Sequence, residues 1–534
     1  MPSFKLDGQT VPFEPGDTII RAAHRVGIDI PHYCWHPGLT VAANCRMCLV
    51  ELAPPPGRRA MMLDVLRYDA DKGEYVKAAK PKLVPACQQA ASEGMEVKSQ
   101  SSEHVAEARA AVQEFLLLNH PVDCPICDQA GECRLQDYWL TASRRGKRMH
   151  DEPVHKPKAV SFGPTIVYDA ERCIVCTRCI RVCNELAKDP VLSVRERGNL
   201  NEIAVAPGRE LDHNYTLMTE YVCPVGALTA KDFRFKARVW FLRTSRGICT
   251  GCSRGCNSFI DYDPRNNTVY RYRPRQNLAV NQYWMCDKGM LDYQRIHADR
   301  ILEARVDGAP TTVVAAMERA RDVLRGAPAG KLGIVLSAQH CQEDNLLLLE
   351  LGRKVLGVDT FYFSARPDAE GDGVLMTGDR NPNRRGLHEL QGARDLRDFA
   401  ALASDIDAGA VTHLLVLGSH ASLPEREAAL GRSGLSVVAI ASHEGPFVRH
   451  ATAVLPASSW AEYDGIFVNL DGIAQKSERA ISPLGDSLPA WKLLADLARA
   501  LGKPFPYKKL SEVRAVLGYE SSPNEPTQLE GTRS

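Results

Sequence analysis

Cysteine spacing constrains this chain more than any other feature of its sequence. The 534 residues include 17 cysteines, and all but two of these fall, together with one histidine, into four groups. The groups are Cys34, Cys45, Cys48 and Cys87; His120, Cys124, Cys127 and Cys133; Cys173, Cys176, Cys179 and Cys223; and Cys249, Cys252, Cys256 and Cys286. Thiolate is the usual protein ligand of iron–sulfur iron, and C-x2-C steps let one loop supply adjacent corners of a cluster. The spacing therefore predicts an electron carrier with several fixed redox centres.

The first and fourth groups each leave one alternative open. The first reads C-x10-C-x2-C with Cys87 further on, and four thiolates in a strand-rich segment are typical of a [2Fe–2S] centre. The fourth reads C-x2-C-x3-C with Cys286 further on, which predicts a tetranuclear site ahead of an α/β domain. Structural zinc is the alternative at both sites. Zinc sites usually combine two short C-x2-C knuckles, and the first group has only one, which favours iron there.

The second group has a histidine where a fourth cysteine would be expected. His120 lies four residues before Cys124, in a C-x2-C-x5-C series with no fourth cysteine nearby. A tetranuclear cluster needs four protein ligands, and His120 can supply the fourth. Because imidazole is neutral and thiolate is anionic, this exchange should shift the reduction potential. The alternative ligand would have to be Cys183 or Cys341, the two cysteines outside the groups.

The third group begins with the C-x2-C-x2-C run of [4Fe–4S] ferredoxins, whose fourth cysteine is followed by proline. Cys183 has the expected x3 offset but precedes Asn184, whereas Cys223 precedes Pro224. We therefore predict that Cys223 is the fourth ligand. Cys183 is then expected to be a small buried apolar residue.

Length and charge narrow the class of protein. A chain of 534 residues is too long for one domain. Its 66 basic and 65 acidic residues give a net charge of +1, which does not indicate a nucleic-acid partner. The first residues lack an apolar signal core, and no stretch is apolar enough to suggest a membrane span. We expect reduced, metal-bound cysteines and no disulfides.

Local patterns predict a small β-rich domain at the start of the chain. Asp7-Gly8 lies between apolar residues and is a strong hairpin signal. Asp17 or Thr18 can cap a helix that runs to Val26. A second helix is predicted from Ser102 to Leu118, where apolar residues keep helical spacing. The polar stretch around residues 71–73 is expected to be a surface insertion.

The composition of the sequence changes after Gly308, and almost no cysteines follow this residue. Strand-like runs at 332–336, 414–417 and 437–441 alternate with helical stretches at 345–356 and 491–501. This alternation predicts an α/β domain with a parallel sheet. The polar segment 520–534 is expected to be disordered.

The ordered ligand set resembles that of a known family. His120-Pro-x-Asp-Cys124-x2-Cys127-Asp-x2-Gly-x-Cys133 and Arg172-Cys173-Ile-x-Cys176-Thr-Arg-Cys179 resemble the iron–sulfur G subunit of bacterial respiratory complex I, the NADH–quinone oxidoreductase. The resemblance is strong over residues 1 to about 300. The remainder resembles, weakly, a molybdopterin oxidoreductase domain. The segment that most resembles this domain is Ala453-Val-Leu-Pro-Ala457, followed by Glu462-x2-Gly465-x-Phe467-Val468-Asn469.

The resemblance implies a specific role. It implies a [2Fe–2S] centre at the first group and [4Fe–4S] centres at the other three, without a catalytic residue in this chain. The flavin and the nicotinamide site would belong to a neighbouring subunit, and electrons would pass on toward quinone-module subunits of a membrane-bound complex. The chain would be a peripheral subunit of a proton-translocating enzyme, on the cytoplasmic side of the inner membrane and inactive alone. Some family members lack the fourth cluster, but its ligands are present here.

Other functions share part of this pattern. A catalytic subunit of a molybdenum formate dehydrogenase-like enzyme or an iron-only hydrogenase would need metal ligands in the second half of the chain, where Cys341 is the sole cysteine. A relay subunit of a NAD-reducing hydrogenase would resemble only the first three groups. The family's α/β portion is often much longer than the one here, so we expect a remnant scaffold without a molybdenum cofactor.

The expected fold class is multidomain, α/β and α+β. The expected domains are a [2Fe–2S] ferredoxin-like (β-grasp) domain at 1–95, a His/Cys3 [4Fe–4S] domain at 96–145, a ferredoxin-type [4Fe–4S] domain at 146–240, a molybdopterin-oxidoreductase-type [4Fe–4S] domain at 241–300, an α/β molybdopterin-oxidoreductase-like remnant at 301–510 and a C-terminal tail at 511–534.

Overall fold

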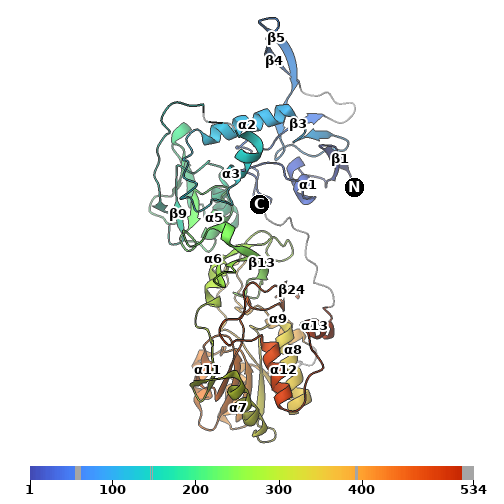
Figure 1. Ribbon diagram of the computed structural model, residues 1–534, viewed down its shortest axis with the longest axis vertical. Helices are drawn as coiled ribbons and strands as arrows, with labels where there is room; N and C mark the ends of the chain where they lie inside the picture. Colours follow the sequence, from blue (N-terminus) through green and yellow to red (C-terminus); the bar gives the residue numbers. More distant parts are fainter. Residues whose placement is uncertain (54–61, 145, 147, 391–394, 520–534) are drawn as a thin grey trace. The chain divides into compact units, whose positions relative to one another are not determined.

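The computed structural model describes residues 1–53, 62–144, 146, 148–390 and 395–519 (Figure 1). The segment 520–534, predicted to be disordered, lies outside these ranges. The described residues form two compact units, 1–240 and 241–519. No helix in the described ranges is long and apolar enough to cross a membrane.

A five-stranded sheet opens the first unit, with the order β2-β1-β7-β3-β6. Its strands are β1 (Ser3–Leu6), β2 (Gln9–Pro12), β3 (Leu49–Ala53), β6 (Leu83–Pro85) and β7 (Glu96–Lys98). The predicted hairpin is confirmed: Asp7 and Gly8, with φ of 48° and 86°, join β1 to β2. The predicted helix is also confirmed, as α1 (Ile19–Arg25), with Thr18 as its N-cap. Strand β7 pairs with β1 and β3, so this sheet continues past the expected domain boundary at residue 95.

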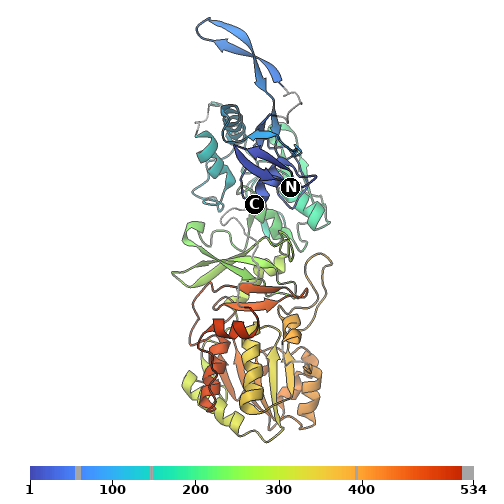
Figure 2. The same cartoon turned by 90° about the vertical axis from the view of Figure 1, so that its right-hand side faces the viewer.

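The predicted surface insertion is a β-ribbon. Strands β4 (Met62–Asp69) and β5 (Glu74–Pro81) pair over their full length as a separate two-stranded sheet. Figure 2 shows this ribbon extending beyond the rest of its unit. Several of its large apolar side chains are exposed, among them Leu66 at 67% and Tyr75 at 69%.

Helices and two small sheets, β12-β9-β8 and β10-β11, make up the rest of the first unit. The predicted helix at 102–118 is confirmed as α2 (Glu103–Leu117), capped by the Ser102 hydroxyl. The remaining elements are α3 (Arg134–Tyr138), β8 (Val160–Ser161), β9 (Ile166–Tyr168), α4 (Arg178–Arg181), β10 (Leu192–Arg195), β11 (Glu202–Val205), α5 (Thr216–Tyr221) and β12 (Leu228–Ala230).

The second unit begins with a three-stranded antiparallel sheet and continues as an α/β domain. The first sheet contains β13 (Arg243–Ile248), β14 (Asn257–Asp263) and β15 (Thr268–Pro274). The α/β domain has a seven-stranded sheet with the order β17-β16-β22-β21-β20-β18-β19. Its strands are β16 (Ala304–Val306), β17 (Ala309–Thr311), β18 (Leu332–Ser337), β19 (Phe361–Ser364), β20 (His413–Leu417), β21 (Ser436–Ala441) and β22 (Ala453–Pro456). Strands β18 to β22 are parallel, which confirms the predicted sheet.

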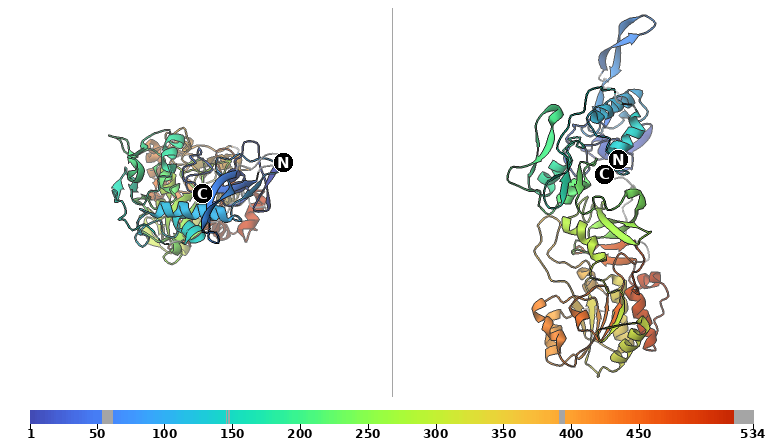
Figure 3. Two further views of the ribbon diagram at one scale, coloured as in Figure 1. Left: turned by 90° about the horizontal axis from the view of Figure 1, so that it is seen from above. Right: turned by 60° about the vertical axis from the view of Figure 1, so that its left-hand side comes forward.

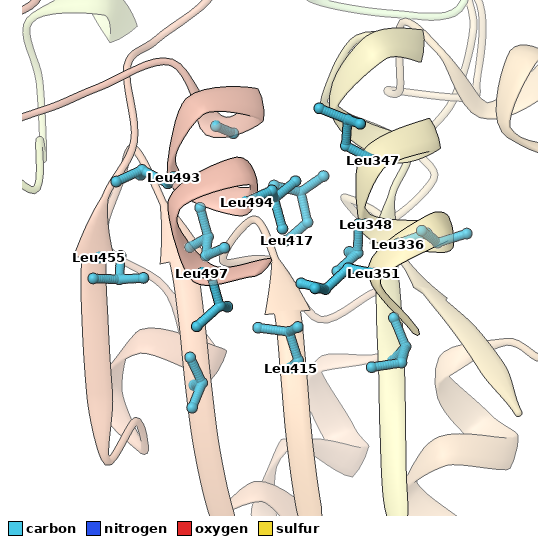
Figure 4. Packing of buried hydrophobic residues seen from close by; sticks show 14 of the residues in the cluster. Leu336, Leu347, Leu348, Leu351, Leu415, Leu417, Leu455, Leu493, Leu494 and Leu497 are labelled. Atoms are coloured by element: carbon cyan, nitrogen blue, oxygen red, sulfur yellow. The ribbon is translucent and has the colours of Figure 1, made fainter. Parts of the chain in front are cut away.

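Helices cover both faces of this sheet, because alternate residues of each strand point to opposite sides (Figure 3). The α-helices of the second unit up to residue 500 are α6 (Asp287–Leu291), α7 (Val313–Arg325), α8 (Gln342–Glu350), α9 (Arg384–Glu389), α10 (Phe399–Asp407), α11 (Pro446–Arg449) and α12 (Ala490–Ala500). Leu415 and Leu417 pack with α7, α8 and α12 on one face, whereas Leu414 and Val416 pack with α10 and α11 on the other. Figure 4 shows the first of these cores, which is built mainly from leucines.

The expected C-terminal tail from residue 511 is wrong at its start. Residues Leu510–Val516 form helix α13, with Val513 fully buried in the leucine-rich core. Arg514 donates to Glu343 of α8 at 2.7 Å. Leu517, just after the helix, also packs against this core, so apolar contacts and one long-range ion pair hold the segment. A hairpin of β23 (Gly465–Val468) and β24 (Ala474–Ser477) completes the unit.

Candidate metal centres

The first ligand group lies beside the five-stranded sheet. Cys34 lies in the irregular segment after α1, Cys45 and Cys48 precede β3, and Cys87 follows β6. Cys34 forms thiol hydrogen bonds with Cys45, and Cys48 forms them with Cys87. The structure thus brings all four predicted ligands together. The hydrogen bond between these two thiols lowers the pKa of Cys34 to about 5 and raises the pKa of Cys45.

The second group meets just beyond the end of α2. His120, Cys124, Cys127 and Cys133 line one cavity. Within the described chain the ring nitrogen Nδ1 of His120 is buried without a hydrogen-bond partner. Burial lowers the pKa of His120 to about 4, so its imidazole is neutral at physiological pH. A buried ring nitrogen without a hydrogen-bond partner, on a neutral imidazole, suits a metal ligand.

The cavity at the second group is large and apolar. It has a volume of about 750 Å3, and its walls include Leu117, Leu118, Trp139 and Leu140. Its polar wall includes Asp123, which accepts from Lys158 at 2.7 Å and from Arg172 at 3.0 Å. These hydrogen bonds lower the pKa of Asp123 and anchor the residue that precedes Cys124.

The third group encloses a small cavity. Cys173, Cys176, Cys179 and Cys223 line a space of only about 10 Å3 between the loop before α4 and the loop after α5. Burial raises the pKa of Cys173 and Cys176 to about 11 and that of Cys223 to about 12. Without metal these thiols are therefore protonated at neutral pH, and iron must displace their protons to bind.

The two remaining cysteines do not line these cavities. Cys183 is fully buried in the π-helical turn Val182–Leu186, with its sulfur 3.4 Å from Nε2 of His213. Cys341 is the N-cap residue of α8 and is also fully buried. A side chain at Gly465 would lie 2.8 Å from the Cβ of Cys341, so β23 packs directly against this cysteine.

The fourth group lies in the second unit. Cys249, Cys252, Cys256 and Cys286 line a cavity of about 260 Å3. Its walls also carry the charged residues Lys288, Asp292, Arg295, Arg366 and Arg380. Burial raises the pKa of all three thiols with a resolved shift, which are Cys249, Cys256 and Cys286.

Sequence motifs did not identify the residues that hold the fourth cysteine loop. Gln475 donates to the Gly255 carbonyl at 2.7 Å, and Asn469 donates to the Arg254 carbonyl at 3.3 Å. Both residues come from the hairpin β23–β24 region, more than 200 positions along the chain. Asn469 belongs to the motif that resembles molybdopterin oxidoreductases, and the structure shows that it supports the cysteine loop.

Sequence reasoning also missed the contact between the second and third groups. Gly226 follows Cys223 by three residues, and a Cβ at this glycine would lie 2.2 Å from the Sγ of Cys127. The backbone N–H of Arg134, next to Cys133, donates to the Pro224 carbonyl at 3.0 Å. One loop therefore carries a predicted ligand of the third site and packs on two predicted ligands of the second.

The donor chemistry fits iron–sulfur clusters at all four sites. Each site offers four side chains of the types that ligate cluster iron, either four thiols or three thiols and a neutral imidazole. No three His, Cys, Asp or Glu side chains in the described ranges are arranged to hold a single metal ion. At the second, third and fourth sites the donors line a cavity and do not meet at one point.

Five family models match successive parts of the chain. They are a 2Fe-2S iron-sulfur cluster binding domain (2–67), the NADH-ubiquinone oxidoreductase-G iron-sulfur binding region (109–145), the NADH-quinone oxidoreductase subunit 3 ferredoxin-like domain (163–229), the molybdopterin oxidoreductase Fe4S4 domain (242–298) and molybdopterin oxidoreductase (353–500). The expected order of cluster domains and the α/β domain is thus confirmed.

Individual relatives agree with these models. The G subunit of the NADH-quinone oxidoreductase of Streptomyces coelicolor is 32% identical over 68% of this chain and 40% of the relative. The corresponding G subunit of Rickettsia felis is 26% identical over 97% of this chain and 90% of the relative. One chain of a NAD+-reducing [NiFe]-hydrogenase aligns with a TM-score of 0.36 and 28% identity, over 45% of this chain and 91% of that chain. The alignments with the Streptomyces and Mycobacterium bovis relatives span about two fifths of those proteins. From the order of its cluster domains and its similarity over most of its length, the chain is homologous to the G subunit of NADH-quinone oxidoreductase.

Proposed function

We propose that this chain is the iron–sulfur relay subunit of a proton-translocating NADH:quinone oxidoreductase. The observation that carries the proposal is the gathering of sixteen ligand-type side chains into four buried groups, three of them within one compact unit. Several centres in one folded body suit electron transfer, because the fold then fixes the distances between them.

The first group would hold a [2Fe–2S] cluster, and the other three groups would each hold a [4Fe–4S] cluster. When bound, such clusters accept and release single electrons. The protein binds them through the sixteen residues described above, shields the third site from water and keeps His120 neutral at the second. The alternative of zinc at the first or fourth site would give a chain with fewer redox centres.

Partner subunits would oxidise NADH and reduce the quinone, and this chain would carry electrons between them. Hydride transfer from NADH requires a two-electron acceptor such as flavin, which we assign to a neighbouring subunit. Electrons would leave toward quinone-module subunits, with this chain peripheral on the cytoplasmic side of the inner membrane. We propose no molybdenum cofactor, because the one cysteine of the α/β domain, Cys341, is fully buried behind β23 and offers no open ligand position.

Metal analysis and kinetics of the purified, cluster-loaded chain test this proposal. We expect about 14 irons per chain, no stoichiometric molybdenum or tungsten, and reduction by dithionite. NADH oxidation with ferricyanide should be absent from the chain alone. A content of about ten irons and one zinc per chain would mean that one predicted tetranuclear site binds zinc instead. Robust NADH turnover would refute the relay assignment, and stoichiometric molybdenum would favour the formate dehydrogenase-like alternative.

A further inference from the structure

Helix α4 carries two buried arginines on either side of a predicted ligand. Arg178 is 2% exposed and Arg181 is 8% exposed, and Cys179 of the third site lies between them. A buried guanidinium is costly unless its donors are satisfied, so the partners of these two side chains show what the burial achieves.

Arg181 joins the first and third sites through a single nitrogen. Its Nη2 donates to the carbonyl oxygen of Cys34, a predicted ligand of the first site, and to that of Cys176, a predicted ligand of the third. Its Nη1 donates to the Thr40 carbonyl, and its Nε donates to the Thr177 carbonyl at 3.3 Å. Within the described residues no carboxylate lies within ion-pair distance of Arg181. Its charge is therefore held by neutral carbonyls.

Arg178 repeats the connection one helical turn earlier. It donates to the carbonyl of Trp35, next to Cys34, and at 3.1 Å to the carbonyl of Val222, next to Cys223. Burial lowers the pKa of the Arg178 guanidinium, because its surroundings solvate the cation less well than water. Both arginines thus place positive charge in a region where added negative charge is stabilised.

We propose that Arg181 is a positioning residue that couples the first and third cluster sites, fixing their loops together and raising the reduction potentials of both clusters. This inference rests on the proposed relay function. Each reduction adds one electron to a cluster, while no bond to the arginine forms or breaks. A buried cation favours the reduced, more negative state through its charge, and the low dielectric of the interior strengthens this effect.

Redox titrations of the full, cluster-loaded chain, followed by EPR, test the proposal with two substitutions and a control. Arg181→Gln removes the charge and leaves a shorter side chain with an amide donor, and Arg181→Lys keeps the charge but loses the forked guanidinium donors. Arg209→Gln is the control, because Arg209 pairs with Asp189 at 2.8 Å and its side chain is 47% exposed.

In Arg181→Gln we expect the equilibrium constants for reduction of the first and third clusters to fall about tenfold. This corresponds to a decrease of about 59 mV in each reduction potential for a one-electron couple. Arg181→Lys should lower both by less, and the control and the fourth cluster should not move. Full iron content with unchanged potentials in Arg181→Gln would overturn the inference and leave the relay function standing. Equal shifts in the Gln and Lys variants would refute the role of charge.

If Arg181→Gln loses iron, its potentials cannot be measured, and Arg181→Lys becomes the test of the inference. In that case we expect the lysine variant to load both clusters and to lower both potentials, and wild-type potentials in it would overturn the inference. A wild-type chain that binds no iron would instead refute the proposed function itself.

Discussion

Gly226 offers a direct test of the contact between the second and third sites. A Cβ added at this position would lie 2.2 Å from the Sγ of Cys127 and 3.0 Å from the Cβ of Gln129. Non-bonded heavy atoms prefer a separation of about 3.5–4.0 Å, so Gly226→Ala forces a displacement of about 1.5 Å.

The loop that carries Gly226 is not free to retreat. The Pro224 carbonyl accepts from the backbone of Arg134 at 3.0 Å, and the Ala227 carbonyl accepts from that of Asp169 at 2.8 Å. We therefore expect Cys127 to move instead. Metal–ligand distances tolerate only about 0.2 Å, so Cys127 would no longer reach the cluster. Overpacking should also cost about 1–3 kcal/mol of unfolding free energy.

Iron analysis and EPR of Gly226→Ala measure this effect. We expect a loss of about four irons per chain and of the second-cluster signal, with the first and fourth clusters retained. Gly146→Ala is the matched control, because Gly146 lines the same cavity and a Cβ there would meet no atom within 4 Å. Full iron content and an unchanged second-cluster spectrum in Gly226→Ala would refute the reasoning.

Three further predictions test the ligands and the α/β domain. His120→Cys should retain its cluster at a lower reduction potential, because an anionic ligand replaces a neutral one, and an unchanged potentiometric EPR titration would exclude His120 as a ligand. Cys183→Ser should leave iron content and spectrum unchanged while Cys223→Ser loses the third-cluster signal, and the opposite result would reverse the two assignments. Glu462→Gln should lower the free energy of unfolding in denaturant by about 3–5 kcal/mol, since it leaves Arg300 buried without its carboxylate. The two side chains are 0% and 2% exposed and form two hydrogen bonds, of 2.8 and 3.0 Å, so a loss below about 1 kcal/mol would contradict this reading.

Much of the fold could be predicted because its signals are local. The Asp7-Gly8 turn, the Thr18 cap and the apolar runs of the parallel sheet each depend on neighbouring residues only. The ligand groups follow the same rule, since most of their members lie within one loop. The choice between Cys183 and Cys223 stays a prediction, although the structure places Cys223 in the wall of the third cavity.

The features that escaped prediction depend on contacts between distant segments. Gly226 shows no special sequence signal, and only the folded chain reveals that it packs on Cys127. Arg181 lies within an ordinary ferredoxin-like run, and its partners Cys34 and Thr40 are more than 140 residues away. Helix α13 is held by Val513, Leu517 and the Arg514–Glu343 ion pair, which dock it onto elements far earlier in the chain.

The ribbon β4–β5 has a practical consequence for anyone who prepares this chain without its partners. Neither of its outer edges pairs with another strand in the described structure, and unpaired edges are templates for association between molecules. Its exposed leucine and tyrosine side chains add hydrophobic attraction, which Lys77 opposes on β5. Shortening this ribbon is therefore the change we would choose to reduce aggregation during purification, because neither of its strands contains any of the sixteen predicted ligands.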